Sequence, residues 1–137
     1  MMAAMLHPSR RVMAVCGDGG FMMNSQDLET AVRLGLNLVV LIIEDKAYGM
    51  IRWKQQLDGF ADFGLTFNNP DFVQYAQAYG ATGYRIASTD EFAPTLQSAF
   101  EAGGVQIVVA PIDYSENQRV LVDELNSKSI LAINSAA

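Results

Sequence analysis

Two short stretches of the chain are uninterrupted runs of apolar residues. Val12–Cys16 leads directly into a group of glycines, and Leu38–Ile43 is rich in β-branched side chains. Short apolar runs without alternation are typical of strands that are buried on both faces of a parallel sheet. The pattern predicts two further strands, over Gly83–Ala87 and Val105–Ile112. We therefore expect a sheet of short parallel strands in which Val12–Cys16 is buried.

Segments with helical periodicity separate these runs. Apolar residues recur at helical spacing from residue 28 to 35, and Asn24 or Ser25 is placed to cap that helix. Asn69-Pro70 has the form of a helix cap followed by a first-turn proline. Glycines follow several of the periodic segments, as is common where helices end. The pattern predicts helices over residues 28–35, 48–57, 72–79, 90–102 and 117–125, and a loop over residues 60–68.

Strands and helices alternate along the chain in the order β-α-β-α-α-β-α-β-α. This order predicts an α/β fold: a three-layer α/β/α arrangement with a mostly parallel sheet and right-handed crossovers. We expect one domain over residues 1–128 and a frayed tail over residues 129–137. Ligands of such sheets bind beyond the C-terminal ends of the strands. The loops after Cys16 and Ile43 lie at that edge, so candidate chemistry is expected there.

Composition narrows the classes of function. The net charge of −6 argues against a nucleic-acid surface, and the longest apolar run is too short to cross a membrane, so we expect a cytoplasmic protein. His7 is the single histidine and is expected at the surface, which argues against a His-based metal cluster or a Ser-His-Asp triad within this chain. Cys16 is the single cysteine. Its place at the end of an apolar run favours a buried, unreactive thiol over a nucleophile.

The loop after the first strand reads Gly17-Asp18-Gly19-Gly20. Glycines let the backbone turn tightly and expose its N–H groups to an anion. A carboxylate among them would repel a phosphate unless a cation lay between the two, and Mg²⁺ favours such oxygen ligands. The alternative is a tight turn in which Asp18 only caps a helix. The loop has neither the lysine of a P-loop nor the spacing of a Rossmann fingerprint.

The second strand ends at Glu44-Asp45-Lys46-Ala47, and Asp45 lies 27 residues after Asp18 (45 − 18). A strand-helix-strand unit of that length returns to the same edge of the sheet, so both carboxylates can share one cation, with a backbone carbonyl just past Asp45 as a third ligand. For Glu44 and Lys46 we favour solvated loop charges. We expect Asp18 to be a loop residue whose replacement by asparagine leaves the fold intact.

These residues, in this order and spacing, resemble the thiamine-diphosphate motif of 2-keto-acid decarboxylases and carboligases. The stretch from Arg11 to Trp53 resembles the large subunits of acetolactate synthases, enzymes of branched-chain amino acid biosynthesis and of a catabolic branch. The likeness continues through NPDFVQYAQAYGA and VVAPIDYSEN, and so covers nearly the whole chain. The resemblance implies the thiamine-diphosphate-binding fold.

The resemblance also implies a role for each matching residue. Asp18, Asp45 and the backbone carbonyl of Ala47 would bind Mg²⁺. Asp45 stands where most of the family has asparagine, and some catabolic acetolactate synthases have aspartate there, which favours that branch. The residues around thiamine diphosphate would be Gly17, Gly19, Gly20 and Phe21 at the diphosphate, and Tyr48, Gly49, Met50 and Ile51 near the reactive end.

By the same resemblance, the chain is N-terminally truncated. The family's cofactor domain begins with another strand and a glycine-methionine-glycine segment, and its pyrimidine-binding domain carries the glutamate that activates the cofactor. That domain and the central domain are absent here. We therefore expect no catalytic residue in this chain and no activity of the chain alone.

In the complete enzyme, a 2-keto acid such as pyruvate would lose carbon dioxide and be joined to a second keto acid. Apolar surface left bare by the absent parts, and sites formed across subunits in the family, predict a homo-oligomer. Two alternatives stay open. The chain is the cofactor domain of another thiamine-diphosphate lyase, such as a benzoylformate-decarboxylase-like or oxalyl-CoA-decarboxylase-like enzyme, or it is an orphan domain that binds or assembles without chemistry.

Overall fold

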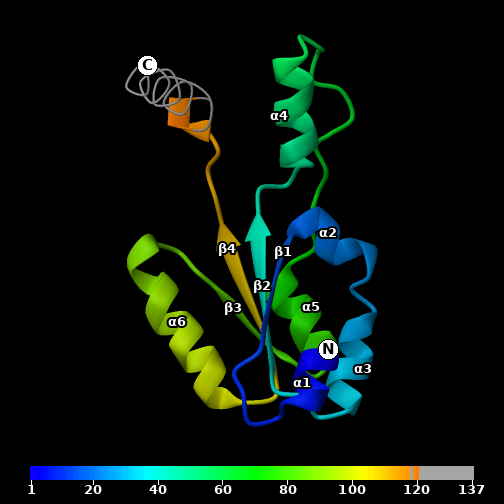
Figure 1. Cartoon of the computed structure of the whole chain (residues 1–137), viewed down its shortest axis with the longest axis vertical. Coiled ribbons are helices and arrows are strands. Elements are labelled where there is room, and N and C mark those ends of the chain that lie inside the picture. The colour runs from blue at the N-terminus through cyan, green and yellow to red at the C-terminus, as the bar shows by residue number, and fades with distance from the viewer. Residues whose placement is uncertain (118, 121–137) are drawn as a thin grey trace, which may run out of the picture.

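The centre of the protein is a four-stranded parallel sheet with the strand order β1-β2-β4-β3. The computed structural model describes residues 1–117, 119 and 120. The strands are β1 (Met13–Gly17), β2 (Leu38–Glu44), β3 (Thr82–Arg85) and β4 (Val105–Pro111). All three pairings are parallel, which confirms the expected α/β fold with a parallel sheet (Figure 1).

Helices cover both faces of the sheet and also stand beyond one of its ends (Figure 1). Two faces are covered because side chains of a strand alternate between them, and both faces of β2 and β4 are apolar. None of the described helices is long and apolar enough to cross a membrane. The helices are α1 (Met2–Leu6), α2 (Asp18–Met23), α3 (Asp27–Arg33), α4 (Gly49–Leu57), α5 (Phe72–Ala78) and α6 (Thr89–Ala102).

Two apolar cores result, one on each face of the sheet. The larger core joins alternate residues of β2 and β4 to α1, α3 and α5, and Phe72 of α5 is fully buried in it. The smaller core joins the other residues of these strands to α6 through Ala99 and the partly buried Leu96 and Phe100. These cores fix β2 and β4 as the central strands, and so fix the strand ends at which the predicted chemistry lies.

The expected burial of the first strand is wrong. β1 pairs with β2 as predicted but lies at the edge of the described sheet. Met13 and Val15 point to the face of α6, which packs on β4 and β2, and their side chains are 41% and 59% exposed. Cys16 points to the other face and is partly buried against the larger core. Burial raises the pKa of its thiol, as expected of an unreactive cysteine.

The helix cap predicted at Asn24 or Ser25 is not formed. The helix after β1 begins at once, at Asp18, and α3 begins only after Gln26, which makes no side-chain cap. Ser25 is buried and accepts a hydrogen bond from the Tyr75 hydroxyl at 2.9 Å, so its oxygen serves a contact with α5. Neither Asn24 nor Ser25 is the N-cap of α3, and these two cap predictions are wrong.

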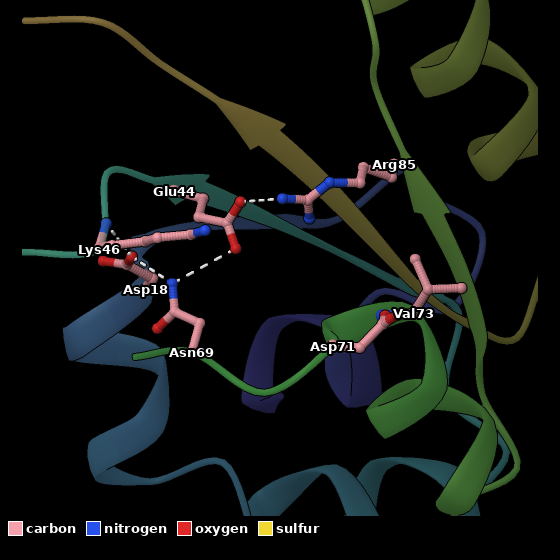
Figure 2. Close-up of polar contacts among 7 residues, drawn as sticks. All are labelled: Asp18, Glu44, Lys46, Asn69, Asp71, Val73 and Arg85. Carbon is pink, nitrogen blue, oxygen red and sulfur yellow. Dashed lines mark hydrogen bonds and ion pairs between the residues drawn. The ribbon is translucent and has the colours of Figure 1, made fainter. Parts of the chain in front are cut away.

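The start of α5 also differs from the prediction. Asp71 is its N-cap, and one carboxylate oxygen accepts hydrogen bonds from the N–H groups of Val73 and Gln74 at 2.9 and 3.2 Å. Asn69, the predicted cap, reaches the end of the sheet (Figure 2). β3 lies close to this helix, because a Cβ on Gly83 would be 2.6 Å from the Cα of Val73.

The remaining boundaries follow the predictions with small shifts. β3 ends at Arg85, earlier than predicted, because the N–H of Ala87 donates to the Glu91 carboxylate at the start of α6. The segment over residues 60–68 is a loop, with one isolated bridge between Ala47 and Thr66. The predicted helix over residues 117–125 lies largely outside the described residues, as does the predicted tail over residues 129–137.

Candidate functional site

A pocket of about 380 Å³ lies at the C-terminal ends of β1 and β2, where α2 and α4 begin. Gly17 and Ile43 are partners in the parallel register, so the chain leaves both strands side by side. We call this space the strand-end pocket. It brings together all but one of the predicted site residues: Gly17, Asp18, Gly19, Gly20, Asp45, Ala47, Tyr48, Gly49, Met50 and Ile51.

Phe21 is the predicted residue that does not line the pocket. Its ring packs edge-on against Phe72 and Tyr75, with centroid distances of 5.6 and 6.2 Å. It therefore joins α2 to α5 on the side of the larger core. A contact of this side chain with a ligand in the strand-end pocket is not supported by the geometry.

Asp18 is held far more firmly than the sequence suggests. It is only 1% exposed, and three hydrogen bonds hold its carboxylate. Oδ1 accepts from the N–H of Gly19 at 2.8 Å. Oδ2 accepts from the N–H of Lys46 at 2.8 Å and from Nδ2 of Asn69 at 2.6 Å (Figure 2). Asp18 is the first residue of α2 and is buried, so the expectation that it lies in a loop outside the core is wrong. Its carboxylate ties three segments together.

Asp45 lies beside Asp18 and is partly buried. Its Oδ1 accepts a hydrogen bond from the N–H of Ala47 at 3.2 Å. Burial raises the pKa of Asp45, and the nearby Asp18 carboxylate acts in the same direction, against the lowering by the Ala47 N–H. Two carboxylates in one pocket repel each other, so a cation between them would relieve that repulsion.

The donor set suits a hard cation whose remaining ligands come from elsewhere. The part of the chain that the structure describes contains no cluster of three or more His, Cys, Asp or Glu side chains that could hold a metal. Asp18 and Asp45 would therefore supply two oxygens, and backbone carbonyls, water or phosphate oxygens would complete the coordination. Mg²⁺ in proteins commonly binds through one or two carboxylates together with substrate phosphates.

The glycines of the pocket shape its floor in two ways. A Cβ on Gly17 or Gly20 would meet nothing within 4 Å, so open space lies over the backbone where a phosphate would have to fit. By contrast, a Cβ on Gly19 would be 2.9 Å from Cε1 of Tyr48, and one on Gly49 would be 2.5 Å from Oδ2 of Asp45. Gly19 and Gly49 thus allow the two walls of the pocket to approach each other.

Two residues near the carboxylates were not predicted from the sequence. Tyr114 follows β4 and lines the pocket, and burial together with the charges of Asp45 and Asp18 raises the pKa of its hydroxyl. It lies beyond the C-terminal end of a strand, so the rule used for Asp18 and Asp45 could have found it. Asn69 contacts Asp18 from a loop 51 residues away, and its only local signal is that of a helix cap.

The two charges that flank Asp45 behave differently. Glu44 is buried, at 5% exposure, and its carboxylate forms an ion pair with Arg85 of β3. The expectation of a solvated charge is therefore wrong for Glu44, because Arg85 compensates its charge across the sheet. Lys46 is exposed as expected, and its backbone has a φ of 58°, which turns its N–H toward Asp18.

Comparisons with known proteins identify the family to which this chain is similar. The family model of the thiamine pyrophosphate enzyme C-terminal TPP binding domain matches residues 1–110; thiamine pyrophosphate is another name for thiamine diphosphate. A catabolic acetolactate synthase of Raoultella terrigena is 38% identical, over 94% of this chain and 23% of that protein. An acetolactate synthase of Bacillus subtilis is 37% identical, over 90% of this chain and 22% of that protein.

A solved structure is also similar to this chain. The thiamine diphosphate-dependent 4-hydroxybenzoylformate decarboxylase of Rhodococcus jostii RHA1 superposes with a TM-score of 0.74 at 27% identity, over 82% of this chain and 22% of that one. The chain thus spans less than a quarter of the length of the relatives described above. Within that span, the chain belongs to the family of thiamine pyrophosphate enzymes, as a C-terminal TPP binding domain similar to those of acetolactate synthases.

Proposed function

We propose that the strand-end pocket binds the diphosphate of thiamine diphosphate through Mg²⁺, within an acetolactate-synthase-like enzyme that acts on pyruvate. The observation that carries this proposal is the pairing of Asp18 and Asp45 in one pocket whose glycine floor is open. Two like charges beside a phosphate-sized space are unfavourable without a cation. A divalent metal between them and a diphosphate satisfies both groups.

The metal would be held by the carboxylates of Asp18 and Asp45 and by the backbone carbonyl of Ala47. The N–H of Ala47 already donates to Asp45, which fixes the short turn between the two residues. Gly17 and Gly20 would border the diphosphate with their backbone. When bound, thiamine diphosphate supplies an electron sink for the decarboxylation of a 2-keto acid.

The wall formed by the start of α4 would face the reactive end of the cofactor. Tyr48, Gly49, Met50 and Ile51 line the pocket there, and Met50 is 71% exposed. A wall so exposed gives little shelter from water by itself. We propose that a pyrimidine-binding domain, which would also supply the activating glutamate, completes it. The chain alone is then expected to form no acetolactate from pyruvate.

One observation favours the alternative that the chain belongs to another thiamine-diphosphate lyase. The structural neighbour described above is a 4-hydroxybenzoylformate decarboxylase, at 27% identity. The acetolactate synthases are more similar in sequence, at 37% and 38%, and we therefore favour the acetolactate-synthase-like enzyme. An orphan domain without chemistry stays the alternative that a failure to bind cofactor would favour.

Assembly into a homo-oligomer, in the cytoplasm, is part of the same proposal. Apolar side chains are exposed along β1 and at the far end of α4, among them Val15, Leu57, Phe60 and Phe63. Exposed apolar surface of this kind commonly marks an interface. Sedimentation of the 137-residue chain is expected to show a dimer or larger species. A monomer at high protein concentration would contradict this part of the proposal.

Calorimetry tests the binding proposal. The chain is titrated with thiamine diphosphate in the presence and in the absence of Mg²⁺, and binding is expected only when both are present. Asp45→Ala should abolish this Mg²⁺-dependent binding, whereas Asp45→Asn should preserve it, because an amide oxygen can still bind the metal. Equal binding of thiamine diphosphate with and without Mg²⁺ would rule out the bridging metal.

A further inference from the structure

We propose that Asn69 is a positioning residue, which fixes the metal-binding orientation of the Asp18 carboxylate. This inference rests on the proposed function, because it concerns the same carboxylate. Asn69 does not line the strand-end pocket, but it donates a hydrogen bond to Asp18, which does. It belongs to a chain of polar contacts that runs from Arg85 through Glu44 and Asn69 to Asp18 (Figure 2).

The side-chain amide of Asn69 uses both of its donors on carboxylates. Nδ2 lies 2.6 Å from Oδ2 of Asp18 and 3.3 Å from Oε1 of Glu44. Its Oδ1 is buried and has no hydrogen-bond partner among the described residues. The two carboxylates therefore determine the orientation of the amide. A neutral donor at this place holds Asp18 without adding negative charge and without competing for a cation.

Glu44 anchors the amide from behind. It is the last residue of β2 and is 5% exposed, and such a buried carboxylate requires a partner. Arg85 provides it from β3, across β4, with a side chain that is 45% exposed. The two oxygens of Glu44 are divided between these partners: Oε2 pairs with Arg85, and Oε1 accepts from Asn69. The position of Asn69 is thus tied to the central strands of the sheet.

The effect on Asp18 differs between its two oxygens. Oδ2 already accepts two hydrogen bonds, from the N–H of Lys46 and from Nδ2 of Asn69. Oδ1 accepts one backbone hydrogen bond, from the N–H of Gly19. A carboxylate oxygen has two acceptor directions, so Oδ1 keeps one for a cation. Asn69 thereby helps to select Oδ1 as the oxygen that binds the metal, as outer partners of metal ligands commonly do.

Calorimetric titration tests the role: Mg²⁺ is added to the 137-residue chain in a fixed excess of thiamine diphosphate, and the Mg²⁺ affinity is measured. Asn69→Ala is expected to weaken Mg²⁺ binding by about tenfold, the lower range for losing an outer partner of a metal ligand. Glu44→Ala removes the anchor behind the amide together with the ion pair to Arg85, and it leaves the contact between Asn69 and Asp18 in place. It should therefore weaken Mg²⁺ binding less, by about twofold to threefold.

Asp71→Ala is the matched control. Asp71 lies two residues from Asn69 in the same segment and caps α5 through Val73 and Gln74, without contact to the carboxylates of the pocket (Figure 2). Thermal unfolding without ligands should show a lower midpoint than wild type for both Asn69→Ala and its control Asp71→Ala. Only Asn69→Ala should also change the Mg²⁺ affinity. Equal Mg²⁺ affinities of Asn69→Ala, Asp71→Ala and wild type would overturn the positioning role.

The outcomes separate this inference from the proposed function. If the wild-type chain binds thiamine diphosphate with Mg²⁺ and Asn69→Ala binds Mg²⁺ equally well, the positioning role fails and the proposed function stands. If the wild-type chain shows no binding that depends on Mg²⁺, the proposed function fails, and the positioning role fails with it. A tenfold loss confined to Asn69→Ala supports both.

Discussion

The two walls of the strand-end pocket differ in how the rest of the protein supports them. On one side, Asp18 is buried and is bound by three hydrogen bonds from three segments. On the other side, α4 stands beyond the strand ends and has no buried residue (Figure 1). The carboxylate wall is thus held in place by contacts within this chain. The α4 wall has few such contacts, because no residue of α4 is buried. This contrast indicates that the metal-binding end is preformed and that the opposite end awaits a further contact.

The largest expected effect concerns the carboxylate wall. Asp18→Ala would leave the N–H groups of Gly19 and Lys46 and the amide of Asn69 without their acceptor. Unpaired buried donors are costly, so the free energy of unfolding without ligands should fall by about 3 kcal/mol. Urea denaturation measures this. A loss below about 0.5 kcal/mol, the usual effect of a surface change, would mean that this wall is not preformed.

A smaller effect is expected where the two walls meet. A Cβ at position 49 would lie 2.5 Å from Oδ2 of Asp45 and 3.2 Å from Cε2 of Tyr114. Gly49→Ala should therefore displace Asp45, with a loss of stability of about 1 kcal/mol. Gly20→Ala is the control, because a Cβ there meets nothing within 4 Å. Equal unfolding midpoints of the two variants would show that the walls are not in close contact at Asp45.

The pH dependence of stability reports on Asp45. Burial and the neighbouring Asp18 raise the pKa of Asp45 in the folded state above its ordinary value of 3.8. The folded state then binds this proton more tightly than the unfolded state, so stability without metal falls as the pH rises from about 3.8 through the raised pKa. Asp45→Asn removes this loss, and should be more stable than wild type at neutral pH but not at acidic pH.

In the presence of Mg²⁺ and thiamine diphosphate, wild type should instead be more stable than Asp45→Asn at neutral pH. The metal favours the ionised carboxylate, so it should stabilise the wild-type chain more at neutral pH than at acidic pH. Thermal unfolding between acidic and neutral pH measures how stability changes with pH, once without the two ligands and once with both. A wild-type chain whose stability without metal rises with pH relative to Asp45→Asn would contradict the raised pKa.

The smallest effect is expected on the α4 wall. Met50 is 71% exposed, so Met50→Ala should change the free energy of unfolding by less than about 0.5 kcal/mol. Urea denaturation of Met50→Ala and of Asp18→Ala gives the two free energies of unfolding to be compared. A loss above about 1 kcal/mol would show that α4 is packed, and would remove the contrast between the walls.

The sequence predicted those features that depend on local pattern and on the rule for parallel strands. β2 and β4 are buried on both faces, which leaves uninterrupted apolar runs over residues 38–43 and 107–111 within them. Parallel strands return to one edge of the sheet, and this rule was enough to predict that Asp18 and Asp45 share one pocket. These predictions needed no knowledge of distant contacts.

The errors have a common cause, which is dependence on residues far away in the chain. The burial of Glu44 depends on Arg85, 41 residues later, and no local signal marks that partner. Asn69-Pro70 has the form of a helix cap, yet the amide of Asn69 binds a carboxylate 51 residues earlier. The exposure of β1 follows from its place at the edge of the described sheet, which its apolar sequence does not reveal.

The position of the metal tests the bridging role of Asp18 and Asp45 most directly. Crystals of the chain grown with Mn²⁺ and thiamine diphosphate would locate the ion by its anomalous scattering, with Mn²⁺ in place of Mg²⁺. We expect one ion in the strand-end pocket, bound by Oδ1 of Asp18, a carboxylate oxygen of Asp45 and the carbonyl of Ala47. An ion bound elsewhere, or a diphosphate bound in the pocket with no ion beside Asp18, would contradict the bridging role.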